Sequence, residues 1–265
     1  CGCNVPGVMA IRNLESRKEK FITAIITCIT IPCMAQTALI LRAVGSRGGI
    51  YVALVFMTLL MVWVGLGVIL KISVQGSTPT LLMEVPPYRL PGFKIQMKKL
   101  KMRLSCYFKE AIPYVLGGIL IINFLDAIGI IQALGHFFSP LIKGVFGLPE
   151  ETVSTLIIGV MRKDAAVALL EPMRLSDSQI VIAVMVLILY FPCVATFTVL
   201  LKELGFADTV KGIAIMFVTT LVLGGFLNLL FRNGLSPIGV IALELILVVL
   251  FFLIDANLTK RGEHS

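Results

Sequence analysis

Long apolar segments alternate with short polar ones along most of the chain. Six segments are apolar over roughly the 20 residues that a helix needs to cross a bilayer, and they lie at residues 21–41, 50–70, 112–134, 180–201, 210–230 and 238–254. A seventh, at residues 148–170, is interrupted by Arg162-Lys163-Asp164, which favours a re-entrant or broken helix. The pattern predicts an all-α fold, a polytopic membrane bundle of about six spans plus this broken helix.

Two of these segments are interrupted by the same dipeptide, Pro32-Cys33 in the first and Pro192-Cys193 in the fourth. A proline inside a helix removes one backbone hydrogen bond, and its ring clashes with the preceding turn. In hydrocarbon, the carbonyl that loses its bond must find another partner. Each break therefore offers carbonyl oxygen and sulfur at membrane depth, and Thr196 adds a hydroxyl, a ligand set suited to a cation. Pro6 predicts a further break, with irregular backbone over residues 1–7.

The two Pro-Cys breaks belong to a longer internal repeat. They lie 160 residues apart (192 − 32 = 160), and upstream Gly7-Val8-Met9 is matched by Gly159-Val160-Met161 after a shift of register. The offset of 160 also aligns, without a gap, Leu41 with Leu201, Arg42 with Lys202, Gly45 with Gly205, Val62 with Val222 and Gly65 with Gly225. A chance recurrence would only kink two helices, but the long register favours a duplication. Interrupted segments at corresponding positions of two repeats indicate the binding site of a transporter.

Basic residues beside the apolar segments indicate the orientation. If residues 148–170 do not cross, the charges at 12–20, 71–109, Lys202/Lys211 and Lys260/Arg261 all fall on one side. Cytoplasmic loops carry such an excess of Lys and Arg, so the basic loop and the C-terminus are predicted to be cytoplasmic. The two repeats then run in opposite senses, as inverted repeats do in transporters.

The sequence predicts four parts. These are a first repeat at residues 1–72, with its upstream part missing, a cytoplasmic proline-rich linker with a basic amphipathic helix at 73–110, a second repeat at 111–258, and a cytoplasmic tail at 259–265. A basic amphipathic helix is typical of segments that lie on an anionic membrane surface. A solvated loop with an orienting charge excess is the simpler alternative.

Composition supports an integral membrane protein that works in a lipid bilayer. Hydrophobic residues make up 58% of the chain and charged residues 14%, against about 25% charged in soluble domains. The net charge is +8, but the basic residues lie beside the apolar segments, as in membrane proteins, so no nucleic-acid partner is predicted. Because Cys28, Cys33 and Cys193 fall in apolar segments, free thiols or metal ligands are favoured over disulfides. The chain contains no phosphate-binding loop motif and begins at Cys1, so we expect no enzyme of that type and a missing natural start.

Polar residues inside the interrupted bundle are further candidates for an ion path. Asn123 and Asp126 lie three positions apart on one face of the third predicted span, and Asp164 belongs to the charged trio of the broken helix. Ionisable groups at membrane depth are costly and commonly functional. The structural alternatives are an interhelical hydrogen bond for the first two and a loop ion pair for Asp164.

Three motifs carry a resemblance to a known family: Gly2-Cys3-Asn4-Val5-Pro6, Glu84-Val85-Pro86-Pro87-Tyr88-Arg89-Leu90-Pro91 and Pro192-Cys193-Val194-Ala195-Thr196. In this order they resemble the C-terminal membrane region of FeoB-type ferrous iron transporters, with its paired Gate segments. The resemblance implies an Fe(II) permease of the prokaryotic inner membrane, with Fe(II) as cargo and no resident cofactor. It also implies a G-protein domain, upstream or on a separate chain, and a possible homo-oligomer. By position, the Gate cysteines of the family correspond to Cys3, Cys33 and Cys193.

The motifs depart from the family pattern around the predicted ligands. Pro32-Cys33-Met34-Ala35-Gln36 differs from the commoner Ser-Cys-Gly-Ala-Arg, and Arg162-Lys163-Asp164 differs from the Arg-Arg-Glu type. These differences affect the ligand set, to which Gln36 and Thr196 are added as candidates, rather than the fold. We expect Cys33 and Cys193 to face each other across the interface between the repeats.

Three alternative functions stay open at the level of the sequence. Gate-type repeats also resemble parts of nucleoside carriers, so the cargo can be a nucleoside or another divalent metal. A membrane thiol oxidoreductase would work through Cys1 and Cys3, but the chain has no C-x-x-C or cofactor motif to support it. The third alternative is a structural fragment that assembles with a missing half.

Overall fold

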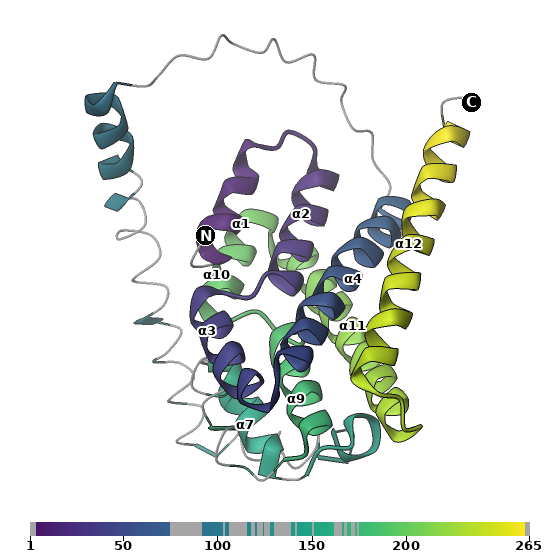
Figure 1. Ribbon diagram of the computed structural model, residues 1–265. Coiled ribbons are helices and arrows are strands. Elements are labelled where there is room, and N and C mark those ends of the chain that lie inside the picture. The colour runs from purple at the N-terminus through teal and green to yellow at the C-terminus, as the bar shows by residue number, and fades with distance from the viewer. Residues whose placement is uncertain are drawn as a thin grey trace.

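The chain folds into a helical bundle, with no strand among the residues that the structure describes (Figure 1). The computed structural model describes residues 4–74, 92–102, 104–105, 142–149, 151–161 and 175–262, and single positions between 116 and 173, with side chains as far as residue 253. The predicted all-α fold is confirmed. Most of the predicted span at 112–134 lies outside the described residues, as do Cys3, Asn123, Asp126 and Asp164.

The first half of the bundle contains four α-helices and two short 3-10 helices. In chain order they are α1 (Asn4–Met9), η1 (Ala10–Asn13), α2 (Arg17–Thr30), α3 (Met34–Ala43), η2 (Gly45–Arg47) and α4 (Gly49–Ser73). The predicted first span is thus two helices, α2 and α3, and Pro32 lies in the three residues between them. Gly48, with φ 133°, makes the turn into α4, a conformation that favours glycine.

The prediction of irregular backbone around Pro6 is wrong from Asn4 onward. Asn4–Met9 is helical, and Pro6 lies in the first turn of this helix. A proline is tolerated there because the first N–H groups of a helix have no partner within the helix. Pro6 therefore belongs to the start of α1 and does not break it.

The second half contains η3 (Ile142–Phe146, one π-helical turn), α7 (Glu151–Met161), α9 (Asp177–Leu189), α10 (Val194–Leu204), α11 (Phe206–Arg232) and α12 (Pro237–Gly262). Here α7, α9, α10 and α11 follow one another in an order similar to that of α1, α2, α3 and α4. Pro192 lies between α9 and α10, as Pro32 lies between α2 and α3. Gly205, with φ 82°, makes the turn into α11. The long helices α4 and α11 that end the two series run in opposite directions through the bundle (Figure 1).

In the segment at residues 148–170, the structure describes α7 and a few positions after it. The described helix α7 has 11 residues, about 16 Å at a rise of 1.5 Å per residue, against a hydrocarbon core of about 30 Å. The interruption predicted at Arg162-Lys163-Asp164 lies outside the described residues and stays a prediction.

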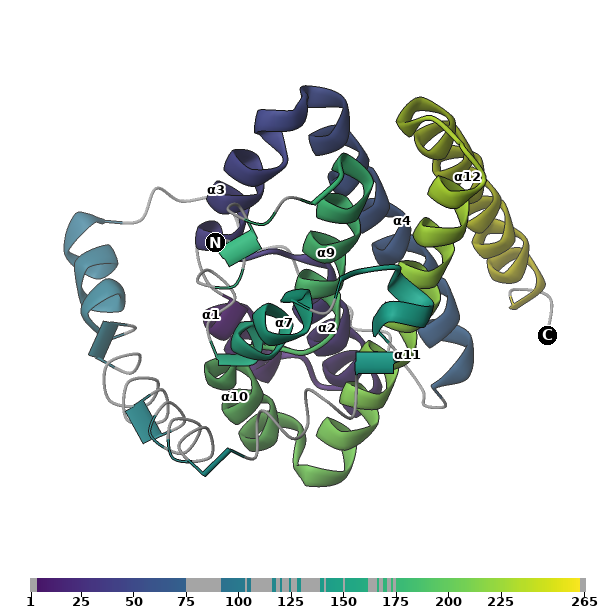
Figure 2. The ribbon, with the colours of Figure 1, turned by 90° about the horizontal axis from the view of Figure 1, so that it is seen from below.

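The core of the bundle is centred on α9. Every residue from Ile180 to Leu189 is buried, as expected for a helix that is apolar on all sides. Helix α9 contacts α2, α4, α7 and α11, and the view from below shows it near the centre (Figure 2). Helix α12 packs along α4 at the side of the bundle (Figure 1).

The outer helices present apolar side chains outward. Trp63 and Ile69 on α4, Val222 on α11 and Phe252 on α12 are all at least half exposed. Among the described residues, α4 and α11 are long and apolar enough to cross a membrane, and α9 and the stretch Pro237–Leu253 are shorter apolar helices. A water-soluble monomer rarely exposes so much apolar surface, so these faces suit contact with lipid.

The basic segment forms a helix over residues 93–102, and each of these residues is exposed. Its lysines and its apolar residues are therefore both free of the bundle core. This part of the predicted amphipathic helix is confirmed as a helix.

Candidate functional site: the two helix breaks

The first break lies between α2 and α3, at Ile31, Pro32 and Cys33. The carbonyl of Ile31 accepts a hydrogen bond of 2.9 Å from Nδ2 of Asn4 in α1. The backbone N–H of Cys33 donates to Oε1 of Gln36 at 3.0 Å, so the Gln36 side chain caps the start of α3. Two backbone groups at the break are therefore satisfied by nearby side chains.

The second break lies between α9 and α10 and has the same backbone form. Cys193, the residue before α10, has φ −62° and ψ 156°, close to the −70° and 162° of Cys33. Its Sγ lies 3.1 Å from Oγ1 of Thr196, one turn into α10. Oη of Tyr190 donates to the carbonyl of Leu156 in α7 at 2.7 Å. Each break is thus tied by a side-chain hydrogen bond to the short helix that opens its half, α1 or α7.

Gln36 and Thr196 occupy equivalent positions but have different polar chemistry. Their side chains are 3% and 2% exposed. Oε1 of Gln36 is used by the cap, and its Nε2 has no hydrogen-bond partner among the described atoms. An amide N–H₂ is a donor and does not ligate a cation. Direct ligation by Gln36 would therefore require its cap on Cys33 to open.

The structure places only part of the predicted ligand set. Cys33 and Cys193 are free thiols of intermediate exposure, whereas Cys28 is buried. Among the described residues, no three His, Cys, Asp or Glu side chains are grouped closely enough to hold one metal ion. Metal binding by the cysteines and their predicted approach to each other stay predictions. The remaining candidates lie outside the described residues: Cys3, Asn123, Asp126 and Asp164.

A cavity of about 230 Å³ lies between α2, α4 and α12. It is lined by Ile26, Trp63, Val64, Gly67, Val68, Lys71 and Phe252. None of the predicted ligands lines it, so this cavity is not the expected ion path.

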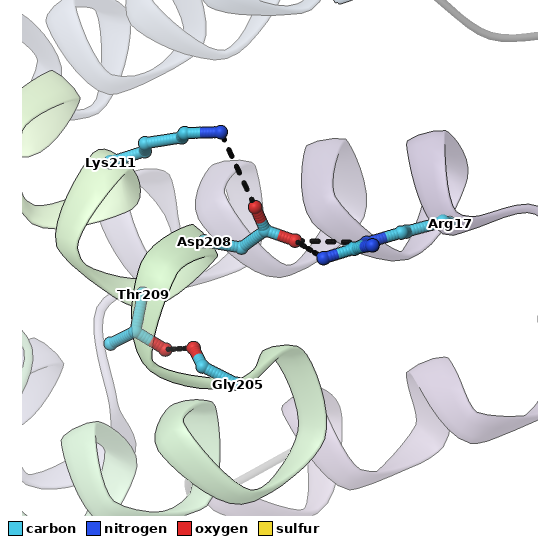
Figure 3. Close-up of polar contacts among 5 residues, drawn as sticks. All are labelled: Arg17, Gly205, Asp208, Thr209 and Lys211. Carbon is cyan, nitrogen blue, oxygen red and sulfur yellow. Dashed lines mark hydrogen bonds and ion pairs between the residues drawn. The ribbon is translucent and has the colours of Figure 1, made fainter.

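Ion pairs link the two halves of the chain. Arg17, the first residue of α2, donates to Oδ2 of Asp208 in α11 from Nε at 3.0 Å and from Nη2 at 2.8 Å (Figure 3). Nζ of Lys211 lies 3.7 Å from the other carboxylate oxygen of Asp208 (Figure 3). Arg47 in η2 pairs with Asp177, the first residue of α9, at 2.6 Å.

Sequence reasoning missed these ion pairs, although the repeat register contained a signal for them. Arg17 and Asp177 are equivalent positions, since 177 − 17 = 160, and they carry opposite charges. Each begins the helix before a Pro-Cys break; Arg17 pairs with Asp208 in the first turn of α11, and Asp177 pairs with Arg47 in the turn before α4. A third link, from Nε of Arg12 to Oε1 of Glu203 at 2.7 Å, lies beside the Arg17–Asp208 pair in the chain.

Two protein-family profiles match adjoining parts of the chain. The profile of Gate, described as nucleoside recognition, matches residues 108–207. The profile of FeoB_C, described as ferrous iron transport protein B C terminus, matches residues 50–103. The first match includes α7, α9 and all of α10 with the second break, and the second includes most of α4. Both regions are parts of transport proteins.

Proteins named Fe(2+) transporter FeoB are similar to the chain. The protein from Methanocaldococcus jannaschii is 23% identical over 87% of this chain and 40% of its own length. The protein from Staphylococcus aureus is 23% identical over 76% of this chain and 35% of its own length. The protein from Helicobacter pylori is 29% identical over 47% of this chain and 20% of its own length. The chain therefore spans 40% or less of the length of these relatives. No solved structure matches the chain. The two profiles and these relatives, together with the helical fold, support an FeoB-type C-terminal region.

Proposed function

We propose that the chain is the membrane permease part of a transporter that moves Fe(II) across the cytoplasmic membrane. The observation that carries this proposal is the pair of helix breaks at Cys33 and Cys193, which have the same backbone conformation at the same position of two series of helices. The named relatives supply the cargo, because each is named an Fe(2+) transporter.

The two series form an inverted repeat in this proposal. Helices α1 to α4 and helices α7 to α11 follow the same order, and α4 and α11 run in opposite directions (Figure 1). Arg17 and Asp177 occupy equivalent positions, their partners Asp208 and Arg47 lie within one residue of equivalence, and the signs of the charges are exchanged. Inverted repeats with broken helices form alternating-access sites near the bilayer midplane. Breaking one ion pair while the other persists would open one side of the bundle at a time.

The Fe(II) path runs along the two breaks. Thiolate, hydroxyl and carbonyl oxygen are acceptable ligands for this borderline cation, and conduction requires that binding not be too tight. Both cysteines immediately precede a helix, α3 or α10, so each sulfur lies at a break, where it can contact a passing cation. We assign the path to Cys3, Cys33 and Cys193 with Gln36 and Thr196 beside them, and place Asn123, Asp126 and Asp164 along the route.

The surroundings of the permease follow from the same proposal. The basic helix at 93–102 and the C-terminus face the cytoplasm, where anionic lipid attracts Lys and Arg. A G-protein domain, in the same protein or on a separate chain, regulates the bundle, and copies of the chain can assemble into a homo-oligomer. No nucleic acid takes part.

The test is uptake of radioactive iron by cells that depend on the protein. Cys33→Ser and Cys193→Ser are each expected to lower the uptake at least tenfold at equal protein level, because a hydroxyl is a far weaker ligand for Fe(II) than a thiolate. Cys28→Ala is the matched control, because Cys28 is a buried thiol inside α2 that is not among the predicted ligands. Unchanged uptake by both serine variants would remove the thiols from the mechanism.

A nucleoside permease is the second candidate, because the matching Gate profile is described as nucleoside recognition. The same cells distinguish the two. Competition of uptake by unlabelled Fe(II) supports the iron permease, whereas uptake of labelled uridine that Fe(II) does not inhibit supports the second candidate.

A further inference from the structure

Glu244 is a buried carboxyl group in α12, away from the two helix breaks. Its side chain is 1% exposed. Oε1 lies 2.7 Å from Oγ1 of Thr58 in α4, which is itself fully buried. Oε2 has no hydrogen-bond partner among the described atoms. An ionisable group at membrane depth is costly and commonly functional, and here its partner is Thr58.

The hydrogen bonds around Thr58 show which form of Glu244 fits this site. Oγ1 of Thr58 also lies 2.9 Å from the carbonyl oxygen of Leu54, but a hydroxyl has only one proton to donate. If Glu244 is a carboxylate, Thr58 donates to it and Oε2 stays an unpaired charged oxygen in the bundle. If Glu244 is neutral, its O–H donates to Thr58, Thr58 donates to Leu54, and only a carbonyl oxygen lacks a partner. The second arrangement costs less, because an unpaired buried charge is far more expensive than an unpaired carbonyl.

No described charged side chain is placed to neutralise Glu244. On α4, Tyr51 and Lys71 lie seven and thirteen residues from Thr58, about 10 Å and 20 Å along the helix. On α11, which precedes α12, the titratable residues are Asp208 and Lys211 near the start and Arg232 at the end, and on α12 Glu244 is the titratable residue whose side chain is described. A proton on Glu244 itself is therefore the simplest source of neutrality.

The packing around the pair keeps water out. Seven residues further along both helices, Gly65 of α4 lies against the ring of Phe251 of α12, so close that an added Cβ would be 3.2 Å from it. Contacts that advance by seven residues on both helices show that α4 and α12 run parallel, in agreement with Figure 1. A separation of α12 from α4 would expose Glu244 to water or to the rest of the bundle.

We propose that Glu244 is a proton-binding site at membrane depth, with Thr58 as its partner, and that it releases its proton when α12 separates from α4 during transport. The coupling to transport rests on the proposed function, but the protonated resting state does not. Nothing leaves the protein except the proton, which returns when the helices close.

The resting state is tested by infrared spectroscopy of the full chain in lipid bilayers. The C=O stretch of a protonated carboxyl group is expected in the wild type and is lost in Glu244→Gln. Thr58→Val, which keeps the shape of the side chain but removes the hydroxyl, shifts the band. Glu203→Gln is the matched control, because its carboxylate pairs with Arg12, and its loss leaves the protonated band unchanged. If Glu244→Gln removes only carboxylate intensity, the proposal is overturned.

The coupling is tested by the pH dependence of Fe(II) uptake. Wild-type uptake is expected to depend on the pH of the compartment into which Glu244 releases its proton. Glu244→Gln is expected to lose this pH dependence, and Glu203→Gln is expected to retain it. Equal pH profiles for the wild type and Glu244→Gln would overturn the coupling. If the wild type takes up no Fe(II) at any pH, the proposed function fails, and the infrared band still decides the proton site.

Discussion

At the scale of single residues, Gln36 and Thr196 make the two breaks chemically different. Gln36 accepts the backbone N–H of Cys33, whereas Thr196 contacts the thiol of Cys193. The backbone N–H of the first cysteine therefore donates to a side-chain amide, while the sulfur of the second lies within hydrogen-bond distance of a hydroxyl. Serine substitution at the two positions removes different interactions, so the two cysteines are not interchangeable.

The cap formed by Gln36 leads to a prediction about stability. Gln36→Ala is expected to lower the stability of the bundle by about 1 kcal/mol, because α3 loses the acceptor at its start. Gln36→Glu retains an oxygen acceptor and favours the positive end of the helix dipole, so it retains most of this stability. The melting temperature in detergent measures both effects.

The control for this comparison is Gln96→Ala, because Gln96 lies in the exposed helix at 93–102. A loss in Gln36→Glu as large as that in Gln36→Ala would show that the side chain does not act as an acceptor for Cys33.

At the scale of elements, the contact between α4 and α12 depends on small side chains in the right register. Gly65 allows the ring of Phe251 to approach α4, and the Thr58–Glu244 pair lies two turns earlier on both helices. Without hydrophobic attraction between helices in lipid, such close approach supplies much of the packing energy. Gly65 and Gly225 are equivalent positions of the internal repeat, and both allow close packing, since Gly65 lies against Phe251 and Gly225 lies against Val145.

A larger residue at position 65 is expected to push α12 away from α4. Gly65→Val should lower the melting temperature in detergent, and Gly65→Val with Phe251→Ala should recover part of the loss, because the smaller residue makes room for the valine. Gly67→Val is the matched control, because an added Cβ there meets Ile26 at 3.8 Å, an ordinary contact distance. Equal losses at both glycines would contradict a specific contact with Phe251.

At the scale of the whole molecule, the sequence predicted what depends on local chemistry. Most of the described helices and both breaks could be predicted from three local features: the length of the apolar segments, the two Pro-Cys interruptions and the glycine turns. Partners across space were not predictable in this way. Arg17–Asp208 and Asp177–Arg47 join residues that are far apart in the chain, and Glu244 finds Thr58 across 186 positions. The helix at Asn4–Met9 does not follow from treating every proline as a helix-breaking residue, because Pro6 lies in the first turn, where proline is tolerated.

The opposite orientation of the two halves leads to the last prediction. Helix α2 begins at Arg17 at one end of the bundle, and α4 begins just after Arg47 at the other end (Figure 1). If the basic segments are cytoplasmic, position 17 faces the cytoplasm and position 47 the outside. A membrane-impermeant thiol reagent added to intact cells is expected to label Arg47→Cys and not Arg17→Cys in a background where the native cysteines are serine.

Permeabilised cells provide the control, because both positions are then accessible: the side chains of Arg17 and Arg47 are 82% and 35% exposed. Labelling needs no transport, so the result is independent of the cysteines and of the cargo. Labelling of both positions from the same side would place the two ion pairs on one face of the membrane. The halves would then not be inverted, and the two pairs could not open opposite sides of the path in turn.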